Sequence, residues 1–173
     1  MEEISAGQAM LIESAMAEEA FLVRPRFERG CRCFAVVIDG WIAGYGWLST
    51  RPEWIGELQL EISPGPDEAY IWNCVTVAEH RRKGIFRALL VGISALCRQE
   101  GLKRLWIGSV AIPAEKAVGP AGFRPALRFA SATLAGLQVM LVGEVDRSLA
   151  AAGLRIMNTR SGIHVRRSIA RLH

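Results

Sequence analysis

The sequence predicts an α/β (or α+β) fold, because strand-like apolar segments alternate with helical segments along its 173 residues. Apolar residues make up 51% of the chain, which is enough for one good core, and the length is too short to expect two. The third observation is an apolar strand, residues 71–77, that runs through a basic turn into a helix with one apolar face, residues 85–97. We therefore expect one folded domain in which helices pack on a sheet.

The N-terminal part predicts an amphipathic helix, because apolar residues recur among glutamates between positions 10 and 20. Only about nine residues precede this helix, so a strand there is short, missing or replaced. Two strand-like segments follow, residues 33–39 and 41–49, with Gly40 between them. The next apolar segment, residues 55–62, alternates with glutamates, and the Pro-rich stretch 63–67 predicts a turn into the strand at 71–77.

The C-terminal half predicts further strands. Residues 105–110 read as a strand, and residues 112–118 read as a short helix. The longest uncharged run, 129–143, is shorter than the roughly 20 residues that a membrane-spanning helix needs. Gly136 divides it into the predicted hairpin strands 127–134 and 137–142.

Basic charge is concentrated at the C-terminus. From position 147 onward there is no carboxylate side chain, and there are six arginines: Arg147, Arg155, Arg160, Arg166, Arg167 and Arg171. Apolar residues are interspersed among them, so the segment is too apolar for a purely solvated arm. We predict a domain at residues 1–146 and a basic extension at 147–173 that packs on the domain or on a second protomer of a homodimer. Contact with nucleic acid is the less favoured alternative.

Cysteine and histidine usage argues against disulfide and metal chemistry. The four cysteines show no CxxC spacing, and the three histidines lack metal-ligand spacing. The N-terminus lacks the pattern of a signal peptide. We therefore expect a cytoplasmic protein with reduced cysteines, no metal and no membrane span.

The basic turn predicts an anion site. The first turn of a helix has backbone N–H groups without partners inside the helix, and its dipole adds partial positive charge. A phosphate group fits such a helix start, and Arg82, Lys83 and Arg87 add full charges there. Gly84 lets the backbone approach a ligand oxygen closely. The chain has neither GxxxxGK[ST] nor GxGxxG, so the usual motifs for ATP and NAD are missing.

The six residues from Arg81 to Phe86 resemble the acyl-CoA signature [Q/R]xxGx[G/A] of the GCN5-related N-acetyltransferases (GNAT family). The strands before the turn and the Gly122-Phe123 pair after it stand where that family has them, so the resemblance covers roughly residues 30–125. It implies a mixed, mostly antiparallel sheet of about six to seven strands flanked by helices and splayed between strands four and five. It also implies that acetyl-CoA, the cosubstrate, is held by Arg81, Arg82, Lys83, Gly84, Ile85, Phe86 and Arg87, with oxyanion donors among the backbone N–H groups of Cys74, Val75 and Thr76.

Three departures from the family pattern leave the function open. Phe86 replaces a small residue, Val118 stands where many members carry a tyrosine that protonates the leaving thiolate, and Gly119-Pro120 interrupts the following helix. The favoured function is transfer of an acetyl group from acetyl-CoA to a primary amine by direct attack in a ternary complex. The alternative is a catalytically degenerate member that binds acyl-CoA as a sensor or assembly module.

The candidate catalytic residues are polar groups near the strand at 71–77. An ammonium acceptor must lose a proton before it attacks, so a carboxylate is needed, and Glu57 and Glu61 are the candidates, with Asn73 as a polar orienter. In the alternative, which is favoured for the glutamates, both lie on the solvent face of an alternating strand. Trp47, Trp54 and Trp72 form an aromatic acceptor pocket or, as the alternative, pack in the sheet.

Overall fold

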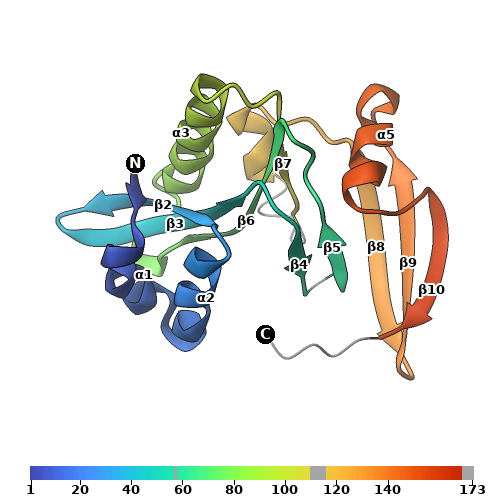
Figure 1. Cartoon of the computed structure of the whole chain (residues 1–173), viewed down its shortest axis with the longest axis horizontal. Helices are drawn as coiled ribbons and strands as arrows, with labels where there is room; N and C mark the ends of the chain where they lie inside the picture. The colour runs from blue at the N-terminus through green and yellow to red at the C-terminus, as the bar shows by residue number, and fades with distance from the viewer. Residues whose placement is uncertain (57, 110–115, 169–173) are drawn as a thin grey trace. The chain divides into compact units, whose positions relative to one another are not determined.

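The computed structural model describes residues 1–56, 58–109 and 116–168, which form two compact units (Figure 1). Unit 1 contains Met1–Arg51 and Pro64–Phe123. Unit 2 contains Pro52–Ser63 and the chain from Arg124 onward. No helix among the described residues is long and apolar enough to cross a membrane.

Unit 1 is a five-stranded sheet with helices on both faces. The strand order is β1-β2-β3-β6-β7, and all neighbouring strands are antiparallel except β6 and β7, which are parallel. Helix α3 covers one face, and α1 and α2 cover the other (Figure 1). The elements are β1 (Glu2–Ile4), the 3₁₀ turn η1 (Ala6–Gln8), α1 (Ala9–Met16), η2 (Ala17–Leu22), α2 (Val23–Glu28), β2 (Arg32–Ile38), β3 (Trp41–Ser49), β6 (Glu68–Thr76), η3 (Ala78–His80), α3 (Ile85–Gln99), β7 (Arg104–Ile107) and η4 (Gly119–Ala121).

Apolar side chains fill the space between the sheet and the helices on each face. Helix α3 buries a stripe at three- and four-residue spacing, which includes Ile85, Leu89 and Ile93. This stripe packs against the sheet together with Phe34, which is fully buried. On the other face, α1 and α2 pack on a second cluster that contains the fully buried Trp47. Strand β6, which leads into α3, contributes side chains to both clusters.

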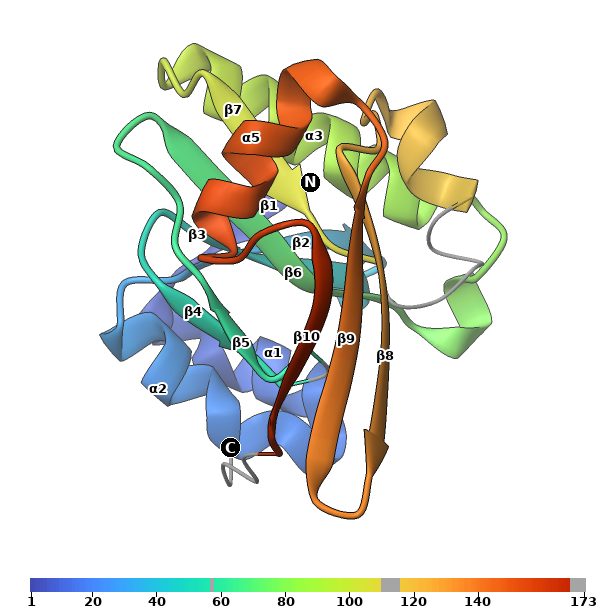
Figure 2. The ribbon, with the colours of Figure 1, turned by 90° about the vertical axis from the view of Figure 1, so that its right-hand side faces the viewer.

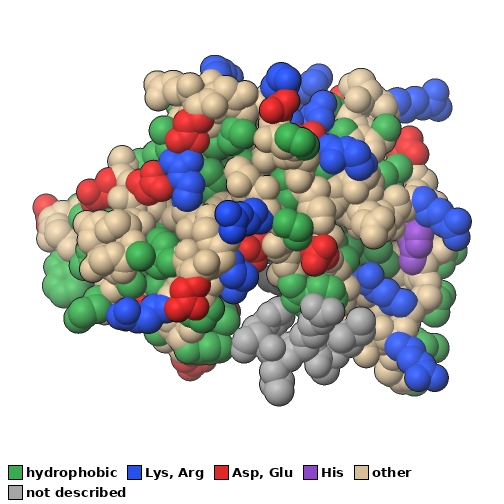
Figure 3. All heavy atoms as spheres, viewed as in Figure 1, with side chains coloured by type: hydrophobic (Ala, Val, Ile, Leu, Met, Phe, Trp, Pro, Cys, Tyr) green, Lys and Arg blue, Asp and Glu red, His purple; other side chains and the backbone are tan. Residues whose placement is uncertain are grey.

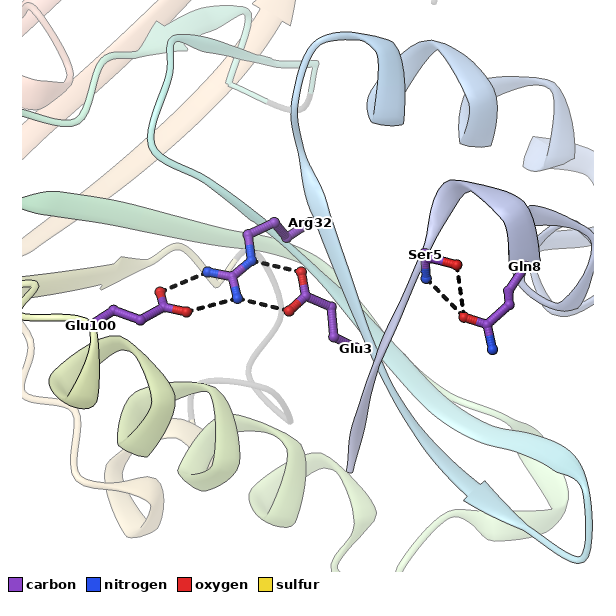
Figure 4. A network of polar contacts seen from close by, with 5 residues as sticks. All are labelled: Glu3, Ser5, Gln8, Arg32 and Glu100. Atoms are coloured by element: carbon purple, nitrogen blue, oxygen red, sulfur yellow. Dashed lines mark hydrogen bonds and ion pairs between the residues drawn. The ribbon is translucent and has the colours of Figure 1, made fainter.

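An ion-pair network ties the first strand to the rest of unit 1 (Figure 4). The guanidinium of Arg32 on β2 binds the carboxylate of Glu3 on β1 at 2.8 Å and that of Glu100, just after α3, at 2.7 Å. Both carboxylates are engaged through two oxygens each, which is the strong geometry for arginine. The short first strand is thus fastened by side chains as well as by its pairing with β2.

Unit 2 contains a two-stranded ribbon, a three-stranded sheet and one helix (Figure 2). The order within the larger sheet is β10-β9-β8, and both pairings are antiparallel. Asp146 caps the helix by accepting a hydrogen bond from the backbone N–H of Ser148 at 2.9 Å. The elements are β4 (Glu53–Ile55), β5 (Leu60–Ile62), β8 (Leu127–Leu134), β9 (Leu137–Glu144), α5 (Arg147–Ile156) and β10 (Gly162–Arg167).

The predicted fold class is confirmed, while the number of strands in the main sheet is five rather than six or seven. The predicted hairpin 127–134 and 137–142 forms as β8 and β9, but these strands pair with β10 in a sheet of their own. The predicted domain boundary at 146/147 falls inside unit 2. The basic segment supplies α5 and β10, and the guanidinium of Arg166 donates to Gln138 Oε1 at 2.7 Å. Lys and Arg side chains prevail over acidic ones on the part of the surface formed by α5 and β8–β10 (Figure 3).

The three-stranded sheet buries one face and exposes the other. Gln138, Met140 and Val142 on β9 are buried, whereas the residues that alternate with them are exposed. The cross-strand register places the exposed apolar side chains on one face, because directly opposed residues of antiparallel strands share a face. This outward apolar face consists of Leu134, Leu137, Val139, Leu141, Ile163 and Val165, each at least 40% exposed.

Candidate functional site

The C-terminal half of β6 has an edge that β7 does not pair. The parallel register joins Glu68 through Ile71 of β6 to Arg104 through Ile107 of β7, and there the described strand β7 ends. Strand β6 continues to Thr76, and its other edge pairs with β3 up to the Gly44–Thr76 position. This is the predicted splay between the two strands. Among the described residues, no strand pairs with the backbone amides of residues 72–76 that point to the β7 side.

The turn after β6 has the backbone geometry of an anion cradle. Gly84 precedes α3 with φ at 78°, and Arg82 has φ at 63°, so the turn contains two left-handed residues. The first bond inside α3 runs from the N–H of Ala88 to the C=O of Gly84 at 2.9 Å. The N–H groups of the three residues before Ala88 consequently have no acceptor within the helix. Arg81, Arg82, Lys83 and Arg87 are exposed around this helix start.

Phe86 lies away from the exposed face of this turn. Its ring is half-buried and packs against the apolar cluster beneath α3, together with Val118 and Phe123. The Phe86 ring therefore does not project into the cradle. Val118 is also half-buried in this cluster. At the position where many family members carry a tyrosine that protonates the leaving thiolate, this chain therefore has an apolar side chain that packs in the core.

Strand β6 contains a bulge where its free edge begins. Trp47 of β3 pairs with Trp72, and Tyr45 pairs with Val75, so Gly46 alone faces both Asn73 and Cys74. Asn73 has φ at 46°, a left-handed conformation that asparagine adopts more readily than most residues other than glycine but that still costs about 1 kcal/mol. The carboxyl-terminal residues Cys74, Val75 and Thr76 are half-buried. Desolvation raises the pKa of Cys74 to about 12, so this thiol stays protonated near neutral pH.

Two residues that the sequence did not single out lie at this bulge, Glu19 and Arg26. The guanidinium of Arg26 on α2 donates to Asn73 Oδ1 at 2.8 Å, and Asn73 Nδ2 lies 3.5 Å from a carboxylate oxygen of Glu19. Glu19 is exposed, whereas Arg26 is 8% exposed. The contact between Arg26 and Asn73 spans 47 residues of sequence. The sequence around Arg26, Val23 to Phe27, contains both Arg24 and Arg26, and no local pattern distinguishes the buried arginine from the exposed one.

The aromatic residues near β6 pack in the sheet. Trp47 is fully buried, and its ring centroid lies 6.5 Å from that of Trp72. Tyr70 stacks on Trp72 at 6.3 Å, and desolvation raises the pKa of the buried Tyr45 to about 12. Trp54 lies on β4 in unit 2. Trp47 is therefore part of the core rather than a lining of an open acceptor pocket.

The two predicted catalytic glutamates have different outcomes. Glu57 lies outside the described residues. Glu61 lies on β5 in unit 2, exposed between the buried Leu60 and Ile62, and its carboxylate accepts a hydrogen bond from the Ser63 hydroxyl at 3.3 Å. This alternation matches the solvent-face alternative for Glu61.

The profile of the acetyltransferase (GNAT) family matches residues 7–119, which include the splay, the bulge and the cradle. The chain belongs to this family. Solved structures with the same fold support the assignment. A ribosomal-protein-alanine N-acetyltransferase from Brucella melitensis is 16% identical, with 68% of this chain and 84% of that chain covered and a TM-score of 0.52.

Two aminoglycoside acetyltransferases are also similar to this GNAT chain. One, from an uncultured soil metagenomic sample, is 19% identical, with coverage of 72% and 90% and a TM-score of 0.52. The other, AAC(6')-Iy in complex with a bisubstrate analogue of CoA, is 10% identical, with coverage of 72% and 89% and a TM-score of 0.56. A search among curated proteins found no match.

Proposed function

We propose that this acetyltransferase moves an acetyl group from acetyl-CoA to a primary amine by direct attack within a ternary complex. The observation that carries the proposal is the continuity of the free edge of β6 with the left-handed turn and the open first turn of α3. The free edge of β6 would offer backbone N–H donors to the carbonyl oxygen of the thioester, and the start of α3 would offer them to the diphosphate.

The cosubstrate would be held mainly by backbone groups. The N–H groups at the start of α3 would bind the diphosphate, with Arg81, Arg82, Lys83 and Arg87 supplying charge from the exposed side of the turn. A Cβ atom at Gly84 would contact nothing within 4 Å, so the backbone conformation rather than lack of space requires glycine there. Among Cys74, Val75 and Thr76, the amides that point to the free edge of β6 would donate to the oxygen of the thioester as it gains negative charge.

The acceptor side would be formed by the polar groups at the bulge. Aminoglycosides and an alanine of a ribosomal protein, the acceptors named for the similar structures, are acetylated on nitrogen or carry amines, which supports an amine acceptor here. We propose that Glu19 takes the proton of the acceptor ammonium, since its exposed carboxylate is the acidic group beside Asn73. Asn73 would orient that carboxylate. The leaving thiol has a pKa of about 8–9 by analogy with cysteine, so its thiolate can leave without a tyrosine acid.

A catalytically degenerate acyl-CoA-binding module is the second candidate. Its supporting observation is Val118, which gives no proton to a leaving thiolate and is packed in the apolar cluster. The two functions share the cradle and differ in turnover.

The deciding experiment measures release of free CoA thiol from acetyl-CoA against a panel of primary amines, with acetyl-CoA binding measured in parallel by calorimetry. We expect thiol release above hydrolysis with at least one amine. Gly84→Val is the comparison variant, because a β-branched residue is strained at a φ of 78°. It should weaken acetyl-CoA binding at least tenfold. Tight binding with no amine-dependent release supports the binding module, and unchanged binding by Gly84→Val contradicts the proposed cradle.

A further inference from the structure

Asn73 holds a conformation that its own sequence neighbours do not explain. It lies at the two-against-one bulge between β6 and β3, with φ at 46°. Gly46 opposite it has no room for a side chain, because a Cβ atom there would lie 2.7 Å from Cys74 Sγ. The bulge is therefore built from both strands. It begins one residue beyond the position at which β6 loses its pairing with β7.

The side chain that holds Asn73 is a buried cation. The guanidinium of Arg26 donates to Asn73 Oδ1 at 2.8 Å, and it stacks over the Trp47 ring with 5.1 Å between the guanidinium carbon and the ring centroid. Its other described contact is Met16 Sδ at 3.9 Å. Desolvation lowers the pKa of Arg26, although the nearby charge of Glu19 acts in the opposite direction.

The burial of this guanidinium carries a desolvation cost. A buried charge is normally paired with an opposite charge, whereas the direct partner of Arg26 is a neutral amide. Replacing buried charged groups by apolar residues of similar volume is often neutral or stabilising. In addition, the indole N–H of Trp47 beside this guanidinium is buried without a hydrogen-bond partner among the described residues. A left-handed residue, a buried guanidinium and an unsatisfied indole N–H therefore meet at one point of the sheet, and such features cluster at functional sites.

We propose that Arg26 is a positioning residue for acetyl transfer. By holding the side chain of Asn73, it fixes the left-handed backbone of that residue and with it the direction of the amides of Cys74 and Val75. This inference rests on the proposed function, in which those amides donate to the thioester oxygen. Arg26 itself contacts no reacting atom, because it lies beneath the bulge and acts through Asn73.

The test compares Arg26→Met with Arg24→Met. Methionine occupies the volume of the arginine stem without its charge, and Arg24 is a matched control because it lies on the same helix with its side chain 65% exposed, paired to Glu13. With an amine acetylated by the parent, we expect Arg26→Met to lower kcat by at least tenfold and to change the KM for acetyl-CoA less than twofold. Its melting temperature should be equal to or above that of the parent. Arg24→Met should match the parent in kcat.

Asn73→Gly makes the test specific to the bulge. Glycine adopts a positive φ without a holding contact, so Arg26→Met should lose at most about threefold in kcat when Asn73 is already glycine. Amide ¹H–¹⁵N shifts of Cys74 and Val75 should move in Arg26→Met and return towards parent values in the double variant. These shifts report whether Arg26 sets the direction of the amides even if the parent acetylates no amine, so a failure of the proposed function is distinguished from a failure of the contact between Arg26 and the bulge. Three results would overturn the inference: losses of kcat in Arg26→Met and Asn73→Gly that add in the double variant, amide shifts that do not move in Arg26→Met, or a loss of kcat that a lower melting temperature explains. If Arg26→Met does not fold, Arg26→Lys takes its place, and full activity of that variant contradicts the need for the arginine fork.

Discussion

Gly44→Ala should destabilise unit 1 because the new methyl group has no space at the point where β3, β6 and α3 meet. A Cβ atom at position 44 would lie 2.9 Å from the backbone oxygen of Val75 and 2.8 Å from Ile85 Cγ2. The backbone oxygen cannot move without shifting β6, so the overlap is relieved only by displacing the strand. Overpacking of this kind typically costs about 1–3 kcal/mol. For a chain of this size each kcal/mol lowers the melting temperature by about 2–4 °C, so we expect a decrease of about 2–12 °C.

Thermal unfolding followed by circular dichroism measures this decrease, with Gly7→Ala as the matched control. Gly7 is also in unit 1, and its Cβ atom would meet only the hydroxyl oxygen of Ser5 at 3.8 Å, which is ordinary contact distance. Both substitutions reduce the entropy of the unfolded chain in the same way, so their difference isolates the overlap. Because Val75 lies on β6 beside the bulge and Ile85 is the first residue of α3, Gly44→Ala should also weaken acetyl-CoA binding. Equal melting temperatures for the two variants would refute the close-packing argument.

Three further outcomes are expected. The hydrogen bond from Arg32 lowers the pKa of Glu3, so this interaction stabilises the fold fully above the ordinary carboxyl pKa and is lost as pH falls through the lowered value. Urea unfolding should show that Glu3→Gln costs under about 1 kcal/mol at pH 7 and progressively less as the pH falls below the ordinary carboxyl pKa. A cost that does not change with pH would contradict this expectation. Glu19→Gln should lower kcat at least tenfold for an amine that is protonated at the assay pH and much less for a weakly basic aromatic amine. Glu18→Gln, at the exposed neighbouring residue, should leave kcat unchanged for both amines. Equal losses of kcat for the two amines in Glu19→Gln would rule out the proposed proton acceptor. The outward apolar face carries no acidic side chain, so a second copy of the chain packed on it would bury no unpaired carboxylate. Analytical ultracentrifugation should show concentration-dependent dimers that Leu141→Lys abolishes. Dimers that persist in this variant would place the interface elsewhere.

The parts of the site that the sequence predicted are those set by local pattern. The stripe from Ile85 to Cys97 fixed the position of α3, and Gly84 fixed the turn before it, because a helix start and a left-handed residue are both determined by neighbours within a few positions. The hairpin of β8 and β9 was predicted for the same reason. Gly136, which is left-handed with φ at 76°, lies in its turn.

The parts that the sequence did not predict depend on contacts between distant residues. No local pattern shows that Arg26 contacts Asn73, or that β8 and β9 pair with β10 rather than with the main sheet. The candidate carboxylates show the same limit. Glu57 and Glu61 are suggested by their position before the central strand in the sequence, whereas Glu19, 54 residues from Asn73, lies beside it in space. Proximity in sequence therefore does not reveal that Glu19 and Asn73 are neighbours.

The composition of the site explains why its cosubstrate is easier to infer than its acceptor. The proposed contacts with acetyl-CoA come from backbone groups whose direction is set by a turn and a free strand edge, so they tolerate departures such as Phe86 and Val118, whose side chains lie in the apolar cluster instead. Acceptor contacts would come from side chains, of which Glu19 and Asn73 are the described pair at the bulge. Differences in acceptor among chains with this backbone would then follow from a few side chains next to an unchanged bulge. In this chain Arg26 is buried beneath the bulge and contacts Asn73 directly. Under the proposal, a substitution of Asn73 that alters the contacts with the acceptor would therefore also alter the direction of the neighbouring amides.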